Sequence, residues 1–215
     1  ADPALGTRFQ REAEALAALS HPHIVPRYEL GEADEVLYFT MEYVEGTDLR
    51  RRLRKGPLSP AEALRVAREI CAALAYSHGR GVLHRDLKPE NVLLDANGAV
   101  RLADFGLAKF SEASAITRTG AVLGTARYMA PEQSGGAKDV DARADLYSLG
   151  AVFYEMLTGS APAGQFLPPS KTVEVDPAFD PIVLRLLQSD RRKRYPDAAS
   201  LGSDLEKLSK RWRSA

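Results

Sequence analysis

The 215-residue sequence contains only one cysteine, Cys71. A single cysteine cannot form an internal disulfide bond, and it excludes a zinc site built from several cysteines. The four histidines do not have the spacing of metal ligands. Disulfide-stabilised secreted scaffolds and zinc-dependent folds are therefore excluded, and a lone thiol fits a reducing compartment.

The sequence also lacks an excess of charge of either sign and a long apolar run. Lysine plus arginine and aspartate plus glutamate number 29 each, so the formal net charge is zero. Such a balance disfavours nucleic acid or an anionic membrane as the main binding partner. No run approaches the ~18 apolar residues of a membrane-spanning helix. We therefore expect a cytoplasmic globular domain that does not bind nucleic acid, with any membrane anchor outside this chain.

Apolar spacing predicts helices and short strands in an order typical of the α+β class. The sequence predicts a first helix around Phe9, two strands between residues 24 and 44 with a turn at 31–34, and a helix from the capping box at 59–62 to Gly79. It further predicts a hairpin around 95–98, a helix at 146–157 that is buried nearly all round, and two or three short helices over 180–212.

Two motifs carry the chemistry. Residues 84–91 read His-Arg-Asp-Leu-Lys-Pro-Glu-Asn, and Asp-Phe-Gly follows at 104–106, after the predicted hairpin. Phosphoryl transfer needs a carboxylate to orient the attacking hydroxyl, oxygen ligands for Mg²⁺ and positive charge near the phosphate. Asp86 can accept from the hydroxyl, Lys88 can reach phosphate, and Asn91 and Asp104 can ligate the metal. Asp-Phe-Gly alone is a common turn sequence, but both motifs in this order form a specific signal.

These motifs resemble those of the eukaryotic-like protein kinases, and Lys88 two residues after Asp86 resembles their serine/threonine branch. The resemblance covers almost the whole chain and has the style of bacterial members. It implies an α+β, protein-kinase-like fold with a residual small lobe over residues 1–43 and a mainly helical large lobe over 44–215. It also implies transfer of the γ-phosphoryl group of ATP, with Mg²⁺, to Ser or Thr of protein substrates. Self-association and autophosphorylation are compatible with it.

The resemblance implies roles for further residues. Nucleotide binding is expected of Glu12, of Leu93, and of the hinge from Glu42 to Val44. Structural roles are expected of Glu132 in the Ala-Pro-Glu motif, of Arg194 as its partner, and of Asp145, which would hold the backbone of the catalytic loop. Regulatory roles are expected of Arg85, as a ligand for phosphate on the activation loop, and of Thr117 and Thr119, as phosphoacceptors.

Several of these residues have a simpler explanation. Asp145 could be an acid beside a helix N-terminus, Arg85 a solvated loop arginine, and Thr117 and Thr119 ordinary loop threonines. For Asp145 and Arg85 the position relative to the motifs favours the family role, whereas phosphorylation of the threonines stays open. The position of Cys71 on an apolar helix face favours a core residue over a reactive thiol.

The basic run at 50–55 has two interpretations. We interpret it as a solvated helix face, and the alternative is a docking site for an acidic partner.

Upstream of the first predicted helix, two features of the family are missing. Residues 1–11 contain no lysine and no Gly-x-Gly-x-x-Gly, although Glu12 on the apolar helix face needs a cation. In addition, Arg27 stands where the family usually has an apolar residue. We therefore expect a fragment of an active kinase. The alternatives are a natural half-lobed relative and, in function, a non-catalytic pseudokinase that acts as a binding or scaffold module.

Overall fold

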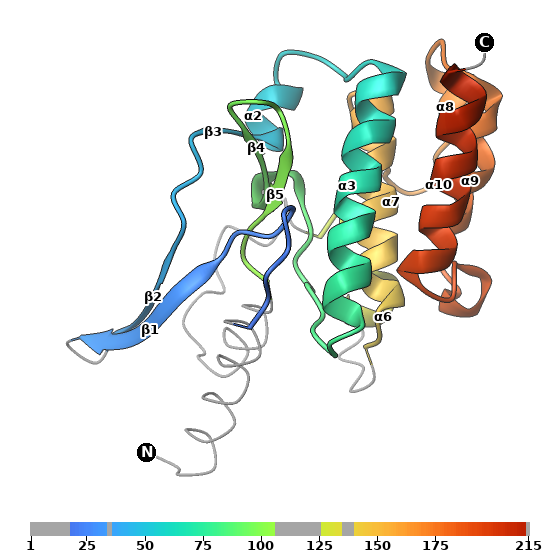
Figure 1. The fold of residues 1–215 in the computed structure, drawn as a ribbon. Helices are drawn as coiled ribbons and strands as arrows, with labels where there is room; N and C mark the ends of the chain where they lie inside the picture. Colours follow the sequence, from blue (N-terminus) through green and yellow to red (C-terminus); the bar gives the residue numbers. More distant parts are fainter. Residues whose placement is uncertain (1–17, 34–35, 106–125, 135–139, 214–215) are drawn as a thin grey trace.

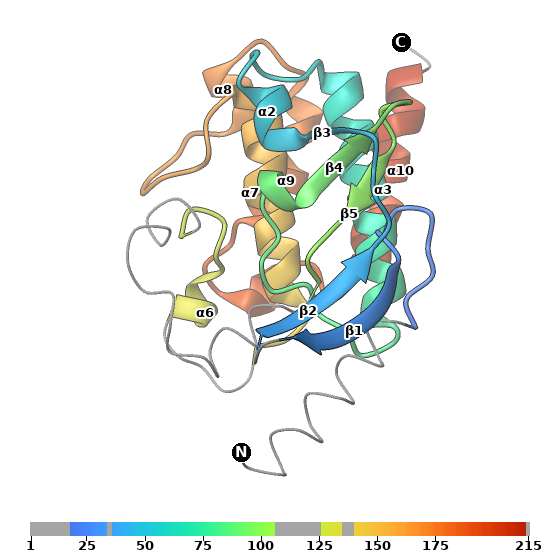
Figure 2. The same ribbon diagram turned by 90° about the vertical axis from the view of Figure 1, so that its left-hand side faces the viewer.

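The computed structural model of the protein describes residues 18–33, 36–105, 126–134 and 140–213. In Figure 1, a ribbon of two strands lies on one side, a small three-stranded sheet lies in the middle, and the long helices lie on the other side. Figure 2 views the molecule from the strand side and shows both sheets in front of the helices. The helix predicted around Phe9 lies outside the described residues, and so do Glu12, which we expect to bind nucleotide, and Thr117 and Thr119.

The first two strands form an antiparallel pair, β1 (Arg27–Ala33) with β2 (Val36–Met41). The turn predicted at 31–34 is wrong in its start, because β1 continues through Ala33 and Gly31 pairs with Tyr38. A Cβ atom at Gly31 would lie 2.4 Å from Cζ of Tyr38, so the tyrosine ring occupies the space above this glycine. Gly31 therefore lies beneath the outer end of the Tyr38 ring within the strand pair, and not in a turn.

The second sheet has the order β3-β4-β5, with β3 (Gly46–Asp48), β4 (Val92–Asp95) and β5 (Val100–Leu102), all antiparallel. The predicted hairpin between β4 and β5 is confirmed. The Asp95 side chain accepts hydrogen bonds from the amides of Asn97 and Ala99 at 2.8 and 2.9 Å. Gly98 has φ of 78°, a conformation that glycine adopts without strain. The hairpin returns the chain to the start of β4.

Three long helices form the base of the molecule: α3 (Pro60–His78), α7 (Arg143–Thr158) and α10 (Ala198–Arg213). The predicted helix start is confirmed, because Ser59 caps α3 and its side chain accepts from the amide of Glu62 at 3.3 Å. The Glu62 carboxylate of the predicted capping box binds Arg52. The prediction that the helix at 146–157 is buried nearly all round is also confirmed. Helix α3 packs against both α7 and α10 and joins them into one core.

The remaining described elements are short: α2 (Leu49–Leu53), η1 (Pro89–Asn91), α6 (Pro131–Ser134), α8 (Pro169–Thr172), η2 (Pro177–Phe179), α9 (Asp180–Leu186) and η3 (Arg191–Lys193). The prediction of short helices over 180–212 is correct for α9 but wrong for α10, which has 16 residues. Leu201, Leu205 and Leu208 recur at helical spacing on its buried face, which extends the helix along α3. In the described part of the chain, no helix combines the length and apolarity needed to cross a membrane.

Candidate active site

Hydrogen bonds hold Asp86, Lys88 and Asn91 together in the loop between α3 and β4. Residues 84–91 of this loop are the catalytic loop expected from the sequence. Lys88 Nζ donates to Asp86 Oδ2 at 2.7 Å, and Asn91 Nδ2 donates to the Asp86 carbonyl at 2.8 Å and to Oδ2 at 3.2 Å. The 3₁₀ turn η1 supplies the bend that returns Asn91 to Asp86. The side chains of Asp86 and Lys88 are 27% and 21% exposed, so a substrate can reach them.

Asp145, in the first turn of α7, binds the backbone that carries Asp86. Its Oδ2 accepts from the amide of His84 at 2.8 Å and its Oδ1 from the amide of Arg85 at 2.7 Å, while His78 Nε2 lies 2.8 Å from Oδ2. Burial raises the pKa of Asp145, but the hydrogen bond from His78 and the nearby positive groups outweigh it and lower the pKa below its ordinary value. Although Asp145 does lie at a helix N-terminus, its carboxylate is bound to the catalytic loop.

Two residues of the described chain other than glycine have a positive φ, Arg85 at 67° and Asp104 at 58°. This left-handed conformation costs ~1–2 kcal/mol for an ordinary residue and persists only where the surroundings hold it. The Arg85 amide is held by Asp145, and the Arg85 carbonyl accepts from Gln133 Nε2 at 2.9 Å. Both strained residues lie in the motifs that the sequence singled out, as is common at functional sites.

The β4–β5 hairpin brings Asp104 back to the catalytic loop. The amide of Ala103 donates to the carbonyl of Asn91 at 3.0 Å. The ring of Phe105 stacks near that of His84, with centroids 4.5 Å apart. Because both neighbours of Asp104 contact the catalytic loop, Asp104 lies in the same site as the cluster of Asp86, Lys88 and Asn91.

Asn91 and Asp104 offer the oxygen atoms that Mg²⁺ prefers in proteins. Both hydrogen bonds of Asn91 Nδ2 go to Asp86, which directs the nitrogen of this amide toward Asp86 and leaves Oδ1 for a cation. In the described residues, no group of three or more His, Cys, Asp or Glu side chains could hold a metal ion. The donors therefore fit a Mg²⁺ that brings water and phosphate oxygens as further ligands, and not a metal in an all-protein cage.

The stretch predicted to be the hinge follows β2. The amide of Glu42 donates to the carbonyl of Pro26 at 3.0 Å, and its carboxylate binds Arg101 Nη2 of β5 at 2.6 Å. Leu93 pairs with Arg101 across the β4–β5 ladder, so these two side chains share one face of the sheet. The structure therefore brings Glu42 and Leu93 to one region through Arg101, with Val44 two residues further along the chain.

The interpretation of the basic run as a solvated helix face is wrong for Arg50. Its Nε donates to Glu90 at 2.8 Å, its Nη1 to Glu155 at 2.6 Å, and its Nη2 to the hydroxyl of Tyr128. Tyr128 in turn donates to Glu155 Oε2 at 2.6 Å. The physical reason is Glu155, a buried carboxylate on α7 that needs a cation. Arg51 of α2, and Arg54 directly after α2, are exposed as predicted.

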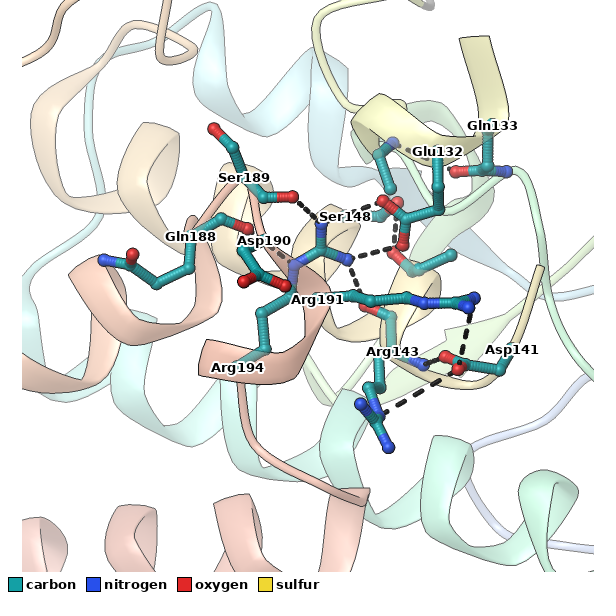
Figure 3. Close-up of polar contacts among 12 residues, drawn as sticks. Glu132, Gln133, Asp141, Arg143, Ser148, Gln188, Ser189, Asp190, Arg191 and Arg194 are labelled. Carbon is teal, nitrogen blue, oxygen red and sulfur yellow. Dashed lines mark hydrogen bonds and ion pairs between the residues drawn. The ribbon is translucent and has the colours of Figure 1, made fainter. Parts of the chain in front are cut away.

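Figure 3 shows Arg194 at the centre of a second network, in which it binds Glu132 of α6. The contact is bidentate, with Nη1 to Oε1 at 2.7 Å and Nη2 to Oε2 at 2.9 Å. Arg194 also donates to the carbonyls of Arg143, Gln188 and Ser189 and is only 2% exposed. Burial raises the pKa of Glu132, but the bond from Arg194 outweighs it, so the pKa lies below its ordinary value.

Sequence reasoning missed several residues that support this site. His78, Tyr128 and Gln133 were not identified, although all three bind the catalytic loop or residues that contact it. For Glu155 the sequence did contain a signal, since it is the only charged residue between Leu146 and Leu157. A lone carboxylate in a buried helix indicates a cationic partner. It does not indicate which arginine is that partner.

Comparison with known proteins agrees with this geometry. The family described as protein kinase domain matches residues 2–208. The serine/threonine-protein kinase PknB of Mycobacterium leprae is 41% identical over 225 residues, which cover 95% of this chain and 36% of that protein. A probable serine/threonine-protein kinase of Streptomyces coelicolor is 43% identical over 227 residues, covering 95% of this chain and 34% of that protein. The chain therefore spans little more than a third of the length of these relatives.

Among solved structures, the kinase domain of PknI from Mycobacterium tuberculosis has a TM-score of 0.76 and 33% sequence identity. The match covers 96% of this chain and 80% of that chain. The expected α+β, protein-kinase-like fold is therefore confirmed. By its sequence and by its fold, this chain belongs to the protein kinase domain family.

Proposed function

We propose that this chain is part of a serine/threonine protein kinase that transfers the γ-phosphoryl group of ATP to Ser or Thr side chains of protein substrates. The observation that carries the proposal is the cluster of Asp86, Lys88 and Asn91 on a backbone fixed by Asp145. The names of the relatives, both serine/threonine-protein kinases, support the same activity and the same class of acceptor.

Asp86 and Lys88 act on the transferring group. Asp86 accepts the hydrogen bond of the attacking hydroxyl and orients its oxygen toward the phosphorus, which is the main task of such a carboxylate. Lys88 Nζ lies 2.7 Å from the Asp86 carboxylate. Its positive charge would therefore be close to the phosphoryl oxygen atoms on which negative charge develops during transfer. The ion pair also holds Lys88 in position before substrate binds.

Asn91, through Oδ1, and Asp104, through a carboxylate oxygen, would hold Mg²⁺. The ion would neutralise charge on the phosphate oxygens. The backbone of Glu42 and Val44 would bind the adenine ring of ATP, and Leu93 would contribute to nucleotide binding. Glu12 completes the nucleotide-binding residues in this proposal.

The second candidate is a non-catalytic pseudokinase that binds partners through its large lobe. The arrangement of Asp86, Lys88 and Asn91 favours the enzyme, because a binding module has no physical need to keep a carboxylate, a lysine and a metal-binding amide hydrogen-bonded to one another. The partners of the enzyme are protein substrates and ATP. Self-association, the absence of nucleic acid binding and a cytoplasmic location stay predictions.

The variant Asp86→Asn in the full-length protein tests the proposal. Turnover of a protein substrate and affinity for Mg-ATP are measured on the same preparations. Because Asp86 acts on the hydroxyl in the transition state and not on the bound nucleotide, kcat should fall ~10²–10⁴-fold while nucleotide affinity stays nearly unchanged. The matched control is Asp204→Asn, which changes the same functional group on α10, outside the site.

Three results would contradict the proposal. Equal losses in nucleotide binding and in turnover would show that Asp86 acts on ground-state ATP. A loss of melting temperature that accounts for the loss of activity would show a structural role. Full-length wild-type protein that binds Mg-ATP but transfers no phosphate to any protein would favour the pseudokinase.

A further inference from the structure

Arg27, the first residue of β1, contacts the Asp104–Phe105 step through its guanidinium group. Its Nη2 donates to the carbonyl of Phe105 at 3.0 Å. On its other side, Cζ lies 4.4 Å from the centroid of the Phe39 ring of β2. The side chain is partly buried. A partly buried charged group requires compensating interactions, which the Phe105 carbonyl and the Phe39 ring supply.

The charge of Arg27 also acts on Asp104, the carboxylate that we propose to bind Mg²⁺. Burial lowers the pKa of Arg27, and the charge of Asp104 opposes this effect, so the two side chains lie within electrostatic reach. The guanidinium keeps its charge, since arginine is not deprotonated in proteins. Arg27 therefore contacts two partners, the Phe105 carbonyl and the Phe39 ring, and its charge acts on Asp104 without a direct contact.

Asp104 needs neighbours that hold it, since its φ of 58° is strained for a residue with a Cβ. On the N-terminal side, the amide of Ala103 is bound to the carbonyl of Asn91. On the C-terminal side, the ring of Phe105 packs on His84, and the carbonyl of Phe105, one residue beyond Asp104, is held by the bond from Arg27. Without the bond from Arg27, the backbone on the C-terminal side of Asp104 loses one of its restraints.

We propose that Arg27 is a positioning residue that ties the β1–β2 strand pair to Phe105 and thereby fixes the orientation of Asp104. The inference rests on the proposed phosphoryl transfer, in which Asp104 binds Mg²⁺. Arg27 itself touches neither the hydroxyl nor the transferring group. Its effect passes through the backbone of Phe105 and through the charge that it places beside Asp104.

The test compares Arg27→Leu with Arg27→Lys in the full-length protein. Leucine fills the space beside Phe39 but makes no hydrogen bond, so the melting temperature should stay close to that of the wild type. The kcat of Arg27→Leu should fall about tenfold, as expected from loss of a charge-assisted hydrogen bond. Lysine keeps the charge and one donor and should recover part of the rate. The Mg²⁺ concentration for half-maximal rate should shift in Arg27→Leu and less in Arg27→Lys.

Hydrogen exchange of the nucleotide-free protein provides a readout that does not depend on activity. In Arg27→Leu, the amides of the peptide that contains residues 103–105 should exchange faster than in the wild type. The matched control is Arg80→Leu, because Arg80 also stacks on an aromatic ring, Tyr76, and also donates to a backbone carbonyl. That contact lies at the end of α3, so the variant should change neither kcat nor the exchange at 103–105.

Wild-type exchange at 103–105 in Arg27→Leu, or wild-type kcat and Mg²⁺ dependence, would overturn the inference. A fall in kcat that parallels a fall in melting temperature would also overturn it, since general destabilisation would then be the cause. If the wild-type protein itself transfers no phosphate, the proposed function fails, and the exchange measurement still decides whether Arg27 holds the Asp104–Phe105 step.

Discussion

Asp145 Oδ1 accepts a hydrogen bond at 2.7 Å from the amide of Arg85, a residue with φ of 67°. The two residues are distant in the sequence, and Asp145 belongs to α7, a helix that is buried nearly all round. The strained backbone next to Asp86 is thus supported by a helix of the buried core. This relationship explains how a loop can hold a catalytic carboxylate in a fixed orientation.

Asp145→Asn should lower the free energy of unfolding by ~2–4 kcal/mol. The amide replaces one acceptor oxygen by a donor, which leaves the amide of His84 or Arg85 buried without a partner. Urea unfolding at neutral pH measures the change. Because two amides and His78 share this carboxylate, kcat should fall as well, even under conditions in which the variant is fully folded.

The stability that Asp145 contributes also depends on pH. Its pKa in the folded protein lies below the ordinary value of 3.8, so the contribution is complete above that value and is lost as the pH falls through the lower folded-state pKa. The wild type should therefore lose its stability advantage over Asp145→Asn on acidification. If the difference in free energy of unfolding between the wild type and Asp145→Asn stays constant on acidification, the lowered pKa of Asp145 is contradicted.

The sequence predicted the elements that are determined locally. The N-cap at Ser59 and the hairpin at Asp95 depend on short-range hydrogen bonds, and both are confirmed. The apolar pattern from Leu146 to Leu157 predicted a buried helix because almost every position there is apolar. In these cases neighbouring residues alone decide the conformation.

The interactions that the sequence did not predict join residues from different elements. Arg50 lies in a run of basic residues that looks solvated, and its partners Glu90, Tyr128 and Glu155 come from three other segments. Gly31 looked like a turn residue because the ring that covers it comes from the opposite strand. The chemistry of phosphoryl transfer indicated Asp86, Lys88, Asn91 and Asp104, whereas the roles of Asp145, Glu132 and Arg194 were expected only from the family resemblance, because these residues are distant in sequence from their partners.

The Arg50 network leads to a third prediction. Arg50→Leu should cost about 3–5 kcal/mol, because it removes the cation from the buried Glu155. Burial lowers the pKa of Arg50, but the bonds to Glu155, Glu90 and Tyr128 outweigh it and raise the pKa above its ordinary value, which indicates a net stabilised charge. The double variant Arg50→Leu with Glu155→Gln should recover part of the loss, and urea unfolding of all three proteins gives the coupling energy.

Arg54 provides the control for this double-mutant cycle of Arg50 and Glu155, since it belongs to the same basic run but is exposed. Arg54→Leu should change the free energy of unfolding by less than ~0.5 kcal/mol. Additive effects of Arg50→Leu and Glu155→Gln, with no coupling between them, would show that the two side chains do not stabilise each other in solution.

Cys71 should be inert in the folded protein. The side chain is 2% exposed and donates to the carbonyl of Ala198 at 3.1 Å, which confirms the prediction of a core residue. Burial, with a contribution from Asp197, raises the pKa of the thiol to about 12, so almost no thiolate exists at mildly alkaline pH. A thiol-alkylating reagent followed by intact-mass measurement should label the protein only in urea. Rapid labelling of the native protein would contradict this prediction.

The last prediction concerns regulation by phosphate. We expect Thr117 or Thr119 to be phosphorylated in active full-length protein and the phosphate to be bound by Arg85. Both threonines lie outside the described residues, and the argument rests on Arg85. Its backbone is fixed by Asp145 and Gln133 directly before Asp86, so a phosphate bound to its guanidinium would add a charge-assisted, bidentate contact beside the catalytic loop.

Phosphopeptide mapping of protein expressed with ATP available should find phosphate at one of the two threonines. The double variant Thr117→Ala with Thr119→Ala should lose most of its activity, and so should Arg85→Ala. If Arg85 acts only through this phosphate, combining all three changes should cost no more than either set alone, because both sets remove the same contact. Additive losses would show that Arg85 and the threonines act separately, and full activity of the double alanine variant would exclude this switch.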